Sequence, residues 1–227
     1  MSRTHVWNLQ RDDAFGDDTV SISRRGAVHS PRELLRPLRR RAYPVVMPLA
    51  PEYFTADMVR ALPDDGTRRE LVWGELLVTP APRGTHQRIA FRLARLLADY
   101  CDALGTLETL PSPADISWGS DTLVQPDVFV VPKSEAITGD WTRMRSLVLV
   151  AEILSPSTAR FDRFQKRKLY QQQRVSTIWL VDVDRWLVEV WTPDARFPVV
   201  ETARVTWHPA GATEPLVIEI AELLRET

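Results

Sequence analysis

Two acidic residues interrupt the most apolar segments of the chain. Asp127 lies in QPDVFVV and Glu152 lies in VAEIL, where most neighbouring side chains are apolar. Burying an isolated carboxylate is unfavourable, so each acid must be neutral, paired with a cation or bound to a metal. If the two acids stand on adjacent strands, their oxygens can converge on one divalent cation, and Mg²⁺ prefers such hard oxygen ligands. A metal held in this way can activate a bound water and neutralise charge on a phosphate.

Each acid also has a structural interpretation. Asp127 follows Pro126, and an aspartate at such a position can cap a turn through its side chain. Glu152 can form an ion pair inside the fold, which compensates a buried charge without any metal. The spacing of the two acids does not choose between these interpretations and the metal site.

The chain contains only three lysines, and two of them follow Glu152 in a basic segment. These two are Lys166 and Lys168, in STARFDRFQKRKLYQQQ, which we predict to be a helix over about residues 157–174 with Ser157 as its N-cap. A lysine beside a metal site can orient the attacking water and stabilise an oxyanion. The free N–H groups at the start of a helix also favour anions.

The same basic helix predicts a contact surface for phosphates. Its only acid is Asp162, and phosphate contacts position a nucleic acid without reading its sequence. The side chains expected to bind the nucleic-acid backbone are Arg160, Arg163, Arg167 and Lys168. The alternative is a solvated helix face that binds no ligand, which is the usual role of a run of charges.

Apolar patterning predicts a mixed α/β fold that would position these side chains. Nearly continuous apolar runs are typical of strands covered on both faces, and residues 85–104 show an apolar stripe of helical period. Besides the helices at 85–104 and 157–174, we predict a short helix between Thr55 and Pro63, a hairpin over 68–80 about Gly74, strands at 106–110, 114–118, 123–132, 146–154, 176–183 and 185–191, and a strand followed by a short helix over 215–226.

Charge divides the chain into two parts. Its 227 residues have a formal net charge of −1 and suffice for one domain with an appendage. Residues 1–45 hold nine arginines against five acidic residues and show poor apolar periodicity, so we predict a basic extension that is disordered or loosely packed. Residues 46–227 form the predicted domain. They are acidic, which weakens any case for broad nucleic-acid affinity.

The number of cysteines and the hydropathy of the chain indicate the cellular compartment to expect. The single cysteine, Cys101, excludes a disulfide framework and fits a reducing cytoplasm. No stretch approaches the ~20 apolar residues of a membrane span, and the N-terminal arginines are not followed by a signal-peptide core. We therefore expect a cytoplasmic protein with no membrane partner.

The motifs stand in the order of a known family. QPDVFVV, VAEILSPST, the four-residue steps from Asp162 to Lys166 and Tyr170, and IWLVDV resemble the Uma-two family, as does RELVWGELLVTPAPRGTHQRIAFRL. The resemblance covers roughly residues 50–192. These proteins are restriction-endonuclease-like and belong to the PD-(D/E)XK superfamily of metal-dependent nucleases. The resemblance implies a restriction-endonuclease-like core, in which a mixed central β-sheet is flanked by α-helices and carries the acids at its centre.

The resemblance assigns roles to particular residues. Asp127 matches the acid of the Pro-Asp motif and Glu152 the acid of the following strand, so both would be catalytic metal ligands. The motif lysine would stand two residues after Glu152, but Leu154 is there, and Lys166 of the next helix matches instead. Glu75 stands where the family usually has an acid, and we predict it as a further catalytic residue and metal ligand.

Other residues near these motifs have weaker assignments. Glu75 can equally be an exposed glutamate of the hairpin, and Glu70 is a less favoured candidate of the same kind. His86 opens the apolar stripe of its helix, which favours a structural histidine, although the family also tends to place a histidine near its acids. Tyr170 lies one helical turn beyond Lys166, so their side chains are neighbours. We predict that His86 and Tyr170 support the site without being metal ligands.

Together these observations predict a Mg²⁺-dependent endonuclease that hydrolyses phosphodiester bonds, with Mn²⁺ as a substitute metal. DNA is the expected substrate, and RNA is not excluded. A homodimer would suit an enzyme that cuts both strands. The alternative is a nucleic-acid-binding or interaction module that keeps the fold without turnover, and both the displaced lysine and the acidic domain leave room for it.

Overall fold

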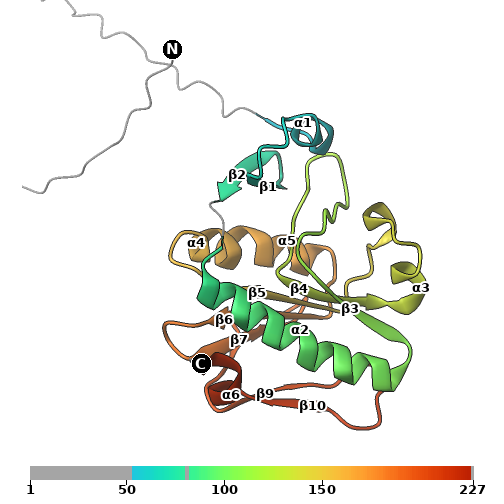
Figure 1. Ribbon diagram of the computed structural model, residues 1–227, viewed down its shortest axis with the longest axis vertical. Coiled ribbons are helices and arrows are strands. Elements are labelled where there is room, and N and C mark those ends of the chain that lie inside the picture. The colour runs from blue at the N-terminus through green and yellow to red at the C-terminus, as the bar shows by residue number, and fades with distance from the viewer. Residues whose placement is uncertain (1–52, 80–81, 226–227) are drawn as a thin grey trace, which may run out of the picture. The chain divides into compact units, whose positions relative to one another are not determined.

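A six-stranded mixed sheet forms the centre of the protein in the computed structural model, which describes residues 53–79 and 82–225 (Figure 1). The strand order is β3-β4-β5-β6-β7-β8, with β5 and β6 parallel and all other neighbours antiparallel. The strands are β3 (Leu107–Pro111), β4 (Val128–Pro132), β5 (Leu149–Ile153), β6 (Thr177–Asp182), β7 (Leu187–Trp191) and β8 (Val199–Glu201). The basic extension predicted for residues 1–45 lies outside the described residues.

Helices and two smaller antiparallel sheets surround the central sheet. The helices are α1 (Ala56–Arg60), α2 (Gly84–Leu104), α3 (Lys133–Ala136), α4 (Ala159–Phe161), α5 (Arg167–Gln172) and α6 (Ile220–Leu224), with a 3₁₀ turn at Trp141–Arg143 and a π-helical turn at Asp162–Lys166. The smaller sheets are the hairpin of β1 (Arg68–Val72) with β2 (Glu75–Thr79) and the pair of β9 (Arg204–Trp207) with β10 (Leu216–Glu219). This architecture confirms the predicted mixed sheet flanked by helices.

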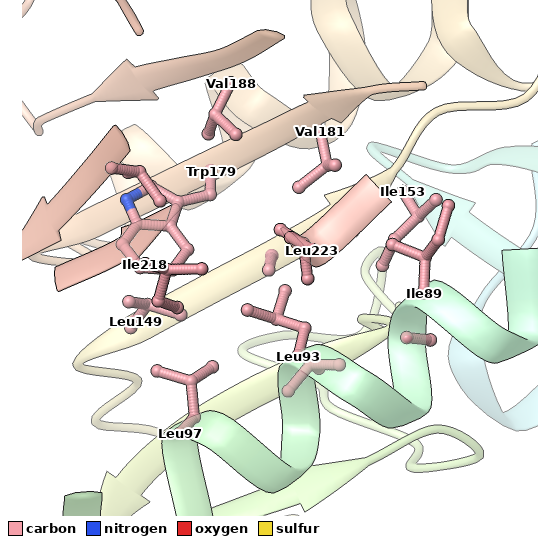
Figure 2. Close-up of a cluster of buried hydrophobic side chains, with 14 of the residues drawn as sticks. Ile89, Leu93, Leu97, Leu149, Ile153, Trp179, Val181, Val188, Ile218 and Leu223 are labelled. Carbon is pink, nitrogen blue, oxygen red and sulfur yellow. The ribbon is translucent and has the colours of Figure 1, made fainter. Parts of the chain in front are cut away.

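The central sheet is covered on both faces, because side chains alternate between the faces along each strand. In β5, Leu149 and Ile153 belong to a core shared with α2, α6 and the β9–β10 pair, and Figure 2 shows this cluster. Val150 belongs to a second core that includes residues of α5. The same alternation directs Glu152 to the side of α5.

The long helix α2 matches the predicted helix closely. Its apolar stripe is buried at Ile89, Leu93, Leu97 and Cys101, which pack on the sheet. The helix ends at Gly105, whose left-handed φ of 72° is a common C-cap conformation for glycine. The hairpin about Gly74 and the short helix capped by Thr55 are confirmed as well.

Short strands account for most of the differences from the predicted elements. Residues 114–118, predicted as a strand, make only a bridge between Ile116 and Val124. The predicted strand at 123–132 begins only at Val128. Sequence reasoning missed β8 and β9, because three or four residues are too few to show a period of two.

The basic segment is also less regular than predicted. It forms α4, the π-helical turn and α5 instead of one uninterrupted α-helix. Ser157 does not cap it: helix α4 starts after Thr158, and the Ser157 hydroxyl lies 3.0 Å from the Ser155 hydroxyl. Local pairing among these hydroxyl groups competes with capping of the helix.

We expect Leu93→Ala to lower the free energy of unfolding by about 2–5 kcal/mol, because it leaves a cavity where α2 packs on the sheet. The matched control is Phe91→Ala on the same helix, where the side chain is 71% exposed and the expected change is within about 0.5 kcal/mol. Urea denaturation of both variants measures the difference. Equal changes in the two variants would contradict this assignment of the buried face.

Candidate active site

The register of β4 and β5 brings the two predicted acids together. Val128 pairs with Ala151, so Asp127, one position before β4, falls opposite Glu152. Residues that face each other across strands have neighbouring side chains. Glu70 of β1 and Asp162 of the π-helical turn complete a group of four buried carboxylates, which we call the acidic cluster. Their exposed fractions are 1–5% (Glu152 1%, Glu70 2%, Asp162 4%, Asp127 5%).

A fully buried lysine joins three members of the acidic cluster. Lys166 Nζ lies 2.8 Å from Glu70 Oε1, 2.7 Å from Glu152 Oε1 and 3.8 Å from Asp162 Oδ1. Burial alone would lower the pKa of Lys166, but the charges of Glu152, Glu70 and Asp162 hold it well above its ordinary value. Lys166 is therefore a permanent cation in this environment.

The π-helical turn contributes two residues to this arrangement. The N–H of Arg167 reaches back five residues to the carbonyl of Asp162, which widens the helix locally. Asp162 and Lys166, four residues apart at its two ends, both lie buried against the site. Such π-helical turns are frequent at functional sites.

Asp127 is held by three donors or potential donors. Its Oδ2 accepts a hydrogen bond of 2.9 Å from the backbone N–H of Ile153 and lies 3.0 Å from His86 Nε2. Its Oδ1 accepts a hydrogen bond of 3.1 Å from Arg68. Burial alone would raise the pKa of Asp127, but the hydrogen bond with His86 and the charge of Arg68 outweigh it and hold the pKa at about 2.

Arg68 is the second permanent cation of the site, and sequence reasoning missed it. Its Nε lies 3.4 Å from Glu70 Oε2, and its guanidinium also donates to the carbonyl of Gln125. Glu70 Oε1 in turn accepts a hydrogen bond of 2.8 Å from the N–H of Gln125. Arg68 stands two residues before Glu70 on β1, and residues with this spacing share a strand face, which is the signal that could have identified it.

Tyr170 and His86, predicted to support the site, each contact one of the two central carboxylates. The Tyr170 hydroxyl donates a hydrogen bond of 2.6 Å to Glu152 Oε1, and its ring is fully buried. His86 lies beside Asp127. These two contacts constrain the orientation of the two central carboxylates.

Glu75 lies outside the acidic cluster. It stands next to the turn of the β1–β2 hairpin, is exposed, and accepts a hydrogen bond of 2.8 Å from the side chain of Gln165. Glu70, the less favoured candidate, is buried among the other acids because it lies in the middle of β1. The geometry thus replaces Glu75 by Glu70 as the third candidate carboxylate.

Two of the four basic residues predicted to bind nucleic acid are engaged within the domain. Arg163 donates to Glu189 at 2.8 Å and also to Asp182. The guanidinium of Arg167 lies 4.1 Å from the ring centroid of Trp191. These contacts fix the basic segment to β6 and β7 and leave Arg163 and Arg167 poorly placed for phosphates. Arg160 and Lys168 are exposed.

The acidic cluster carries more negative charge than its side-chain cations compensate. Its four carboxylates face two permanent cations, Arg68 and Lys166. Burial raises the pKa of Glu152 to about 8, with Lys166 opposing the shift and Asp127 reinforcing it. Burial likewise raises the pKa of Asp162 to about 6, against the effect of Lys166. An excess of buried negative charge favours uptake of protons or of another cation.

A cavity of about 750 Å³ opens onto the acidic cluster and is lined by all four of its carboxylates. Hard carboxylate oxygens with excess negative charge are the donor chemistry that Mg²⁺ or Mn²⁺ requires. Within residues 53–79 and 82–225, no three His, Cys, Asp or Glu side chains are spaced as a ready metal site. Lys166 Nζ instead stands between Glu70 and Glu152. The carboxylate oxygens thus have the chemistry that a divalent cation needs, but their spacing in this arrangement is that of ion pairs with Lys166.

The chain matches the Uma2 family, described as "Putative restriction endonuclease", over residues 56–221, and therefore belongs to that family. A solved structure with a similar fold is described as a "putative nuclease belonging to DUF820 from Anabaena variabilis ATCC 29413". The TM-score is 0.64 with 23% sequence identity, and the match covers 75% of this chain and 97% of that one. None of the curated proteins matches the chain. No helix in the described part of the chain is long and apolar enough to cross a membrane.

The raised pKa of Glu152 predicts that stability falls with rising pH in EDTA. Between the ordinary glutamate pKa of 4.5 and about 8, the folded protein keeps a proton that the unfolded chain releases. Unfolding then releases a proton, so the free energy of unfolding decreases by up to about 1.4 kcal/mol per pH unit in this window. Thermal melts between pH 5.5 and 8.5 measure it.

Glu152→Gln should flatten this dependence, because the amide does not titrate. Glu75→Gln is the matched control and should retain it, since Glu75 is exposed and lies outside the acidic cluster. A wild-type stability that stays constant or rises across the window would contradict the assigned protonation of Glu152.

Proposed function

We propose that this protein is a metal-dependent endonuclease that hydrolyses phosphodiester bonds, with DNA as its substrate. The observation that carries the proposal is the buried acidic cluster with Lys166 at the wall of an open cavity. So many buried charges are unfavourable for stability and are typical of catalytic sites. Membership of the Uma2 family, whose description is that of a restriction endonuclease, supports the same reaction class.

Asp127 and Glu152 would hold Mg²⁺ or Mn²⁺, with Glu70 or Asp162 as a further carboxylate ligand. When bound, the metal supplies an activated water and neutralises charge on the scissile phosphate. Asp127 is suited to this role because it stays ionised, and its orientation is fixed by Arg68, His86 and the Ile153 N–H. The hydroxyl of Tyr170 holds the carboxylate of Glu152 in place.

In this proposal Lys166 supplies a positive charge and N–H donors to the reaction. Since the surrounding acids keep its ammonium protonated, it does not serve as the base that removes a proton from water. Its N–H groups can instead orient the attacking water and stabilise the negative charge that develops on phosphate oxygens. Arg160 and Lys168, exposed on the same basic segment, are the candidates for contacts with the backbone of the substrate.

The alternative is a binding module without turnover on the same fold. One observation favours it: Lys166 and Arg68 already pair with the acids, so these ion pairs account for part of the buried charge without any metal. The two functions differ in whether divalent metal produces cleavage.

Cleavage of supercoiled plasmid, single-stranded DNA and RNA in Mg²⁺, Mn²⁺ or EDTA tests the proposal. We expect metal-dependent cutting by the wild type and a loss of about 10²–10⁴-fold in Asp127→Asn, Glu152→Gln and Lys166→Met. Glu75→Gln, outside the acidic cluster, is the control and should cut as the wild type does. Thermal melts establish that each variant is folded.

No cutting of any substrate by folded wild-type protein, with either metal, would reject the endonuclease in favour of the binding module. Normal cutting by Glu152→Gln would instead reject the assigned metal ligands while leaving the reaction class in place.

A further inference from the structure

Two exposed aromatic side chains line two different cavities beside the acidic cluster. Trp186, 47% exposed, lines the cavity that opens onto the cluster, which we call the first cavity. Phe91, 71% exposed, lines a second cavity of about 800 Å³ beside α2. The two cavities share four lining residues (Arg68, Pro82, His86 and Asp127). They therefore meet at the candidate catalytic residues, with one aromatic ring in each.

The backbone at Trp186 is held in an unfavourable conformation. Its φ of 54° lies in the left-handed region, which glycine and asparagine adopt readily and a tryptophan adopts only at a cost of about 1–2 kcal/mol. The residue sits in the turn between β6 and β7, where a smaller residue would fold more easily. Strained residues that persist are concentrated at functional sites, and here the strained residue lines the first cavity.

The position of Phe91 is equally unexplained by packing. The buried stripe of α2 runs through Leu93 and Leu97, and Phe91 lies off it. Phe91 instead lines the second cavity together with Ala90 and Ala94 of the same helix.

Each aromatic residue has an exposed arginine in the same cavity. Arg83 lines the first cavity with Trp186, and Arg95 lines the second cavity with Phe91, one helical turn away on α2. A ring that stacks on a base and a cation that pairs with a phosphate are the two components of single-strand binding sites. An aromatic ring and an exposed arginine thus occur together in each of the two cavities.

We infer that the two cavities form one binding track for an unpaired nucleic-acid strand, with Trp186 and Phe91 stacking on bases on either side of the scissile phosphate. Bases inside a duplex are already stacked on their neighbours, so rings can reach base faces only in single-stranded, frayed or flipped-out segments. The inference rests on the proposed nuclease function for the position of the scissile phosphate. It adds a substrate class, unpaired strands, and the residues that select it.

Binding without cleavage tests the track separately from the reaction. Fluorescence anisotropy in EDTA at low salt compares a labelled single-stranded oligonucleotide, its duplex and an abasic strand that keeps the phosphates but lacks the bases. We expect the wild type to bind the single strand more tightly than the duplex or the abasic strand. Trp186→Asn and Phe91→Ala should each weaken single-strand binding about 5- to 100-fold and change abasic-strand binding by less than about twofold.

Two matched variants control for loss of any exposed aromatic ring. Trp73→Asn removes another partly exposed tryptophan with a left-handed φ, of 50°, in the β1–β2 turn, and Phe197→Ala removes an exposed phenylalanine. Neither residue lines a cavity described above, so both variants should bind as the wild type does. Asparagine accepts the left-handed conformation, so Trp186→Asn should melt within about 3 °C of the wild type.

Each result separates the track from the reaction. Single-strand binding that depends on both rings, without any metal-dependent cutting, would support the track and reject the nuclease. Cutting that is unaffected by Trp186→Asn and Phe91→Ala, together with unchanged single-strand binding, would reject the track and keep the nuclease. Equal binding of duplex and single strand, or no binding of either, would also reject the track.

Discussion

The structure depends on the compensation of buried carboxylates by the half-buried Arg68 and, above all, by the fully buried Lys166. Its ammonium lies within ion-pair distance of Glu70 and Glu152, which come from the β1–β2 hairpin and from β5. An unpaired charge in this interior would be strongly unfavourable, so the hairpin, the sheet and the π-helical turn can pack together only with these pairs formed. Apolar packing stabilises the two faces of the sheet, whereas ion pairs stabilise the arrangement of the candidate site.

The two cations compensate the four carboxylates only in part. The remaining negative charge is what allows the site to take up a proton or a further cation. Four carboxylates share two permanent cations, so burial raises the pKa of Glu152 while Asp127 remains ionised. Well-packed apolar residues in place of such a cluster would often be more stable. A fold that retains the acidic cluster is less stable than it could be, but it keeps carboxylate oxygens that can release a proton and bind a cation.

The basic segment supplies only one of the two cations of the site, Lys166. Within residues 46–227 the basic segment after β5 has the highest density of positive residues, yet Arg163 and Arg167 bind within the domain and stabilise the attachment of this segment to β6 and β7. The cation beside Asp127 comes from the hairpin instead, as Arg68. The aromatic residues that line the two cavities come from helix α2 and from the turn between β6 and β7.

The sequence by itself determined the mixed α/β architecture, the long helix α2, and Asp127 and Glu152 as buried acids, because apolar runs and the acids within them leave a local signal. Lys166 is assigned through the family resemblance, since Leu154 stands where the motif lysine is expected. Tertiary structure decided which further acid joins them. Glu70 and Glu75 are both glutamates, five residues apart on one hairpin, and only the docking of that hairpin buries Glu70 among the carboxylates. Arg68, the role of Arg163 and the strand register that sets Asp127 opposite Glu152 depend on contacts between residues far apart in the chain. Such contacts form only when the elements pack, and no periodicity within a single element encodes them.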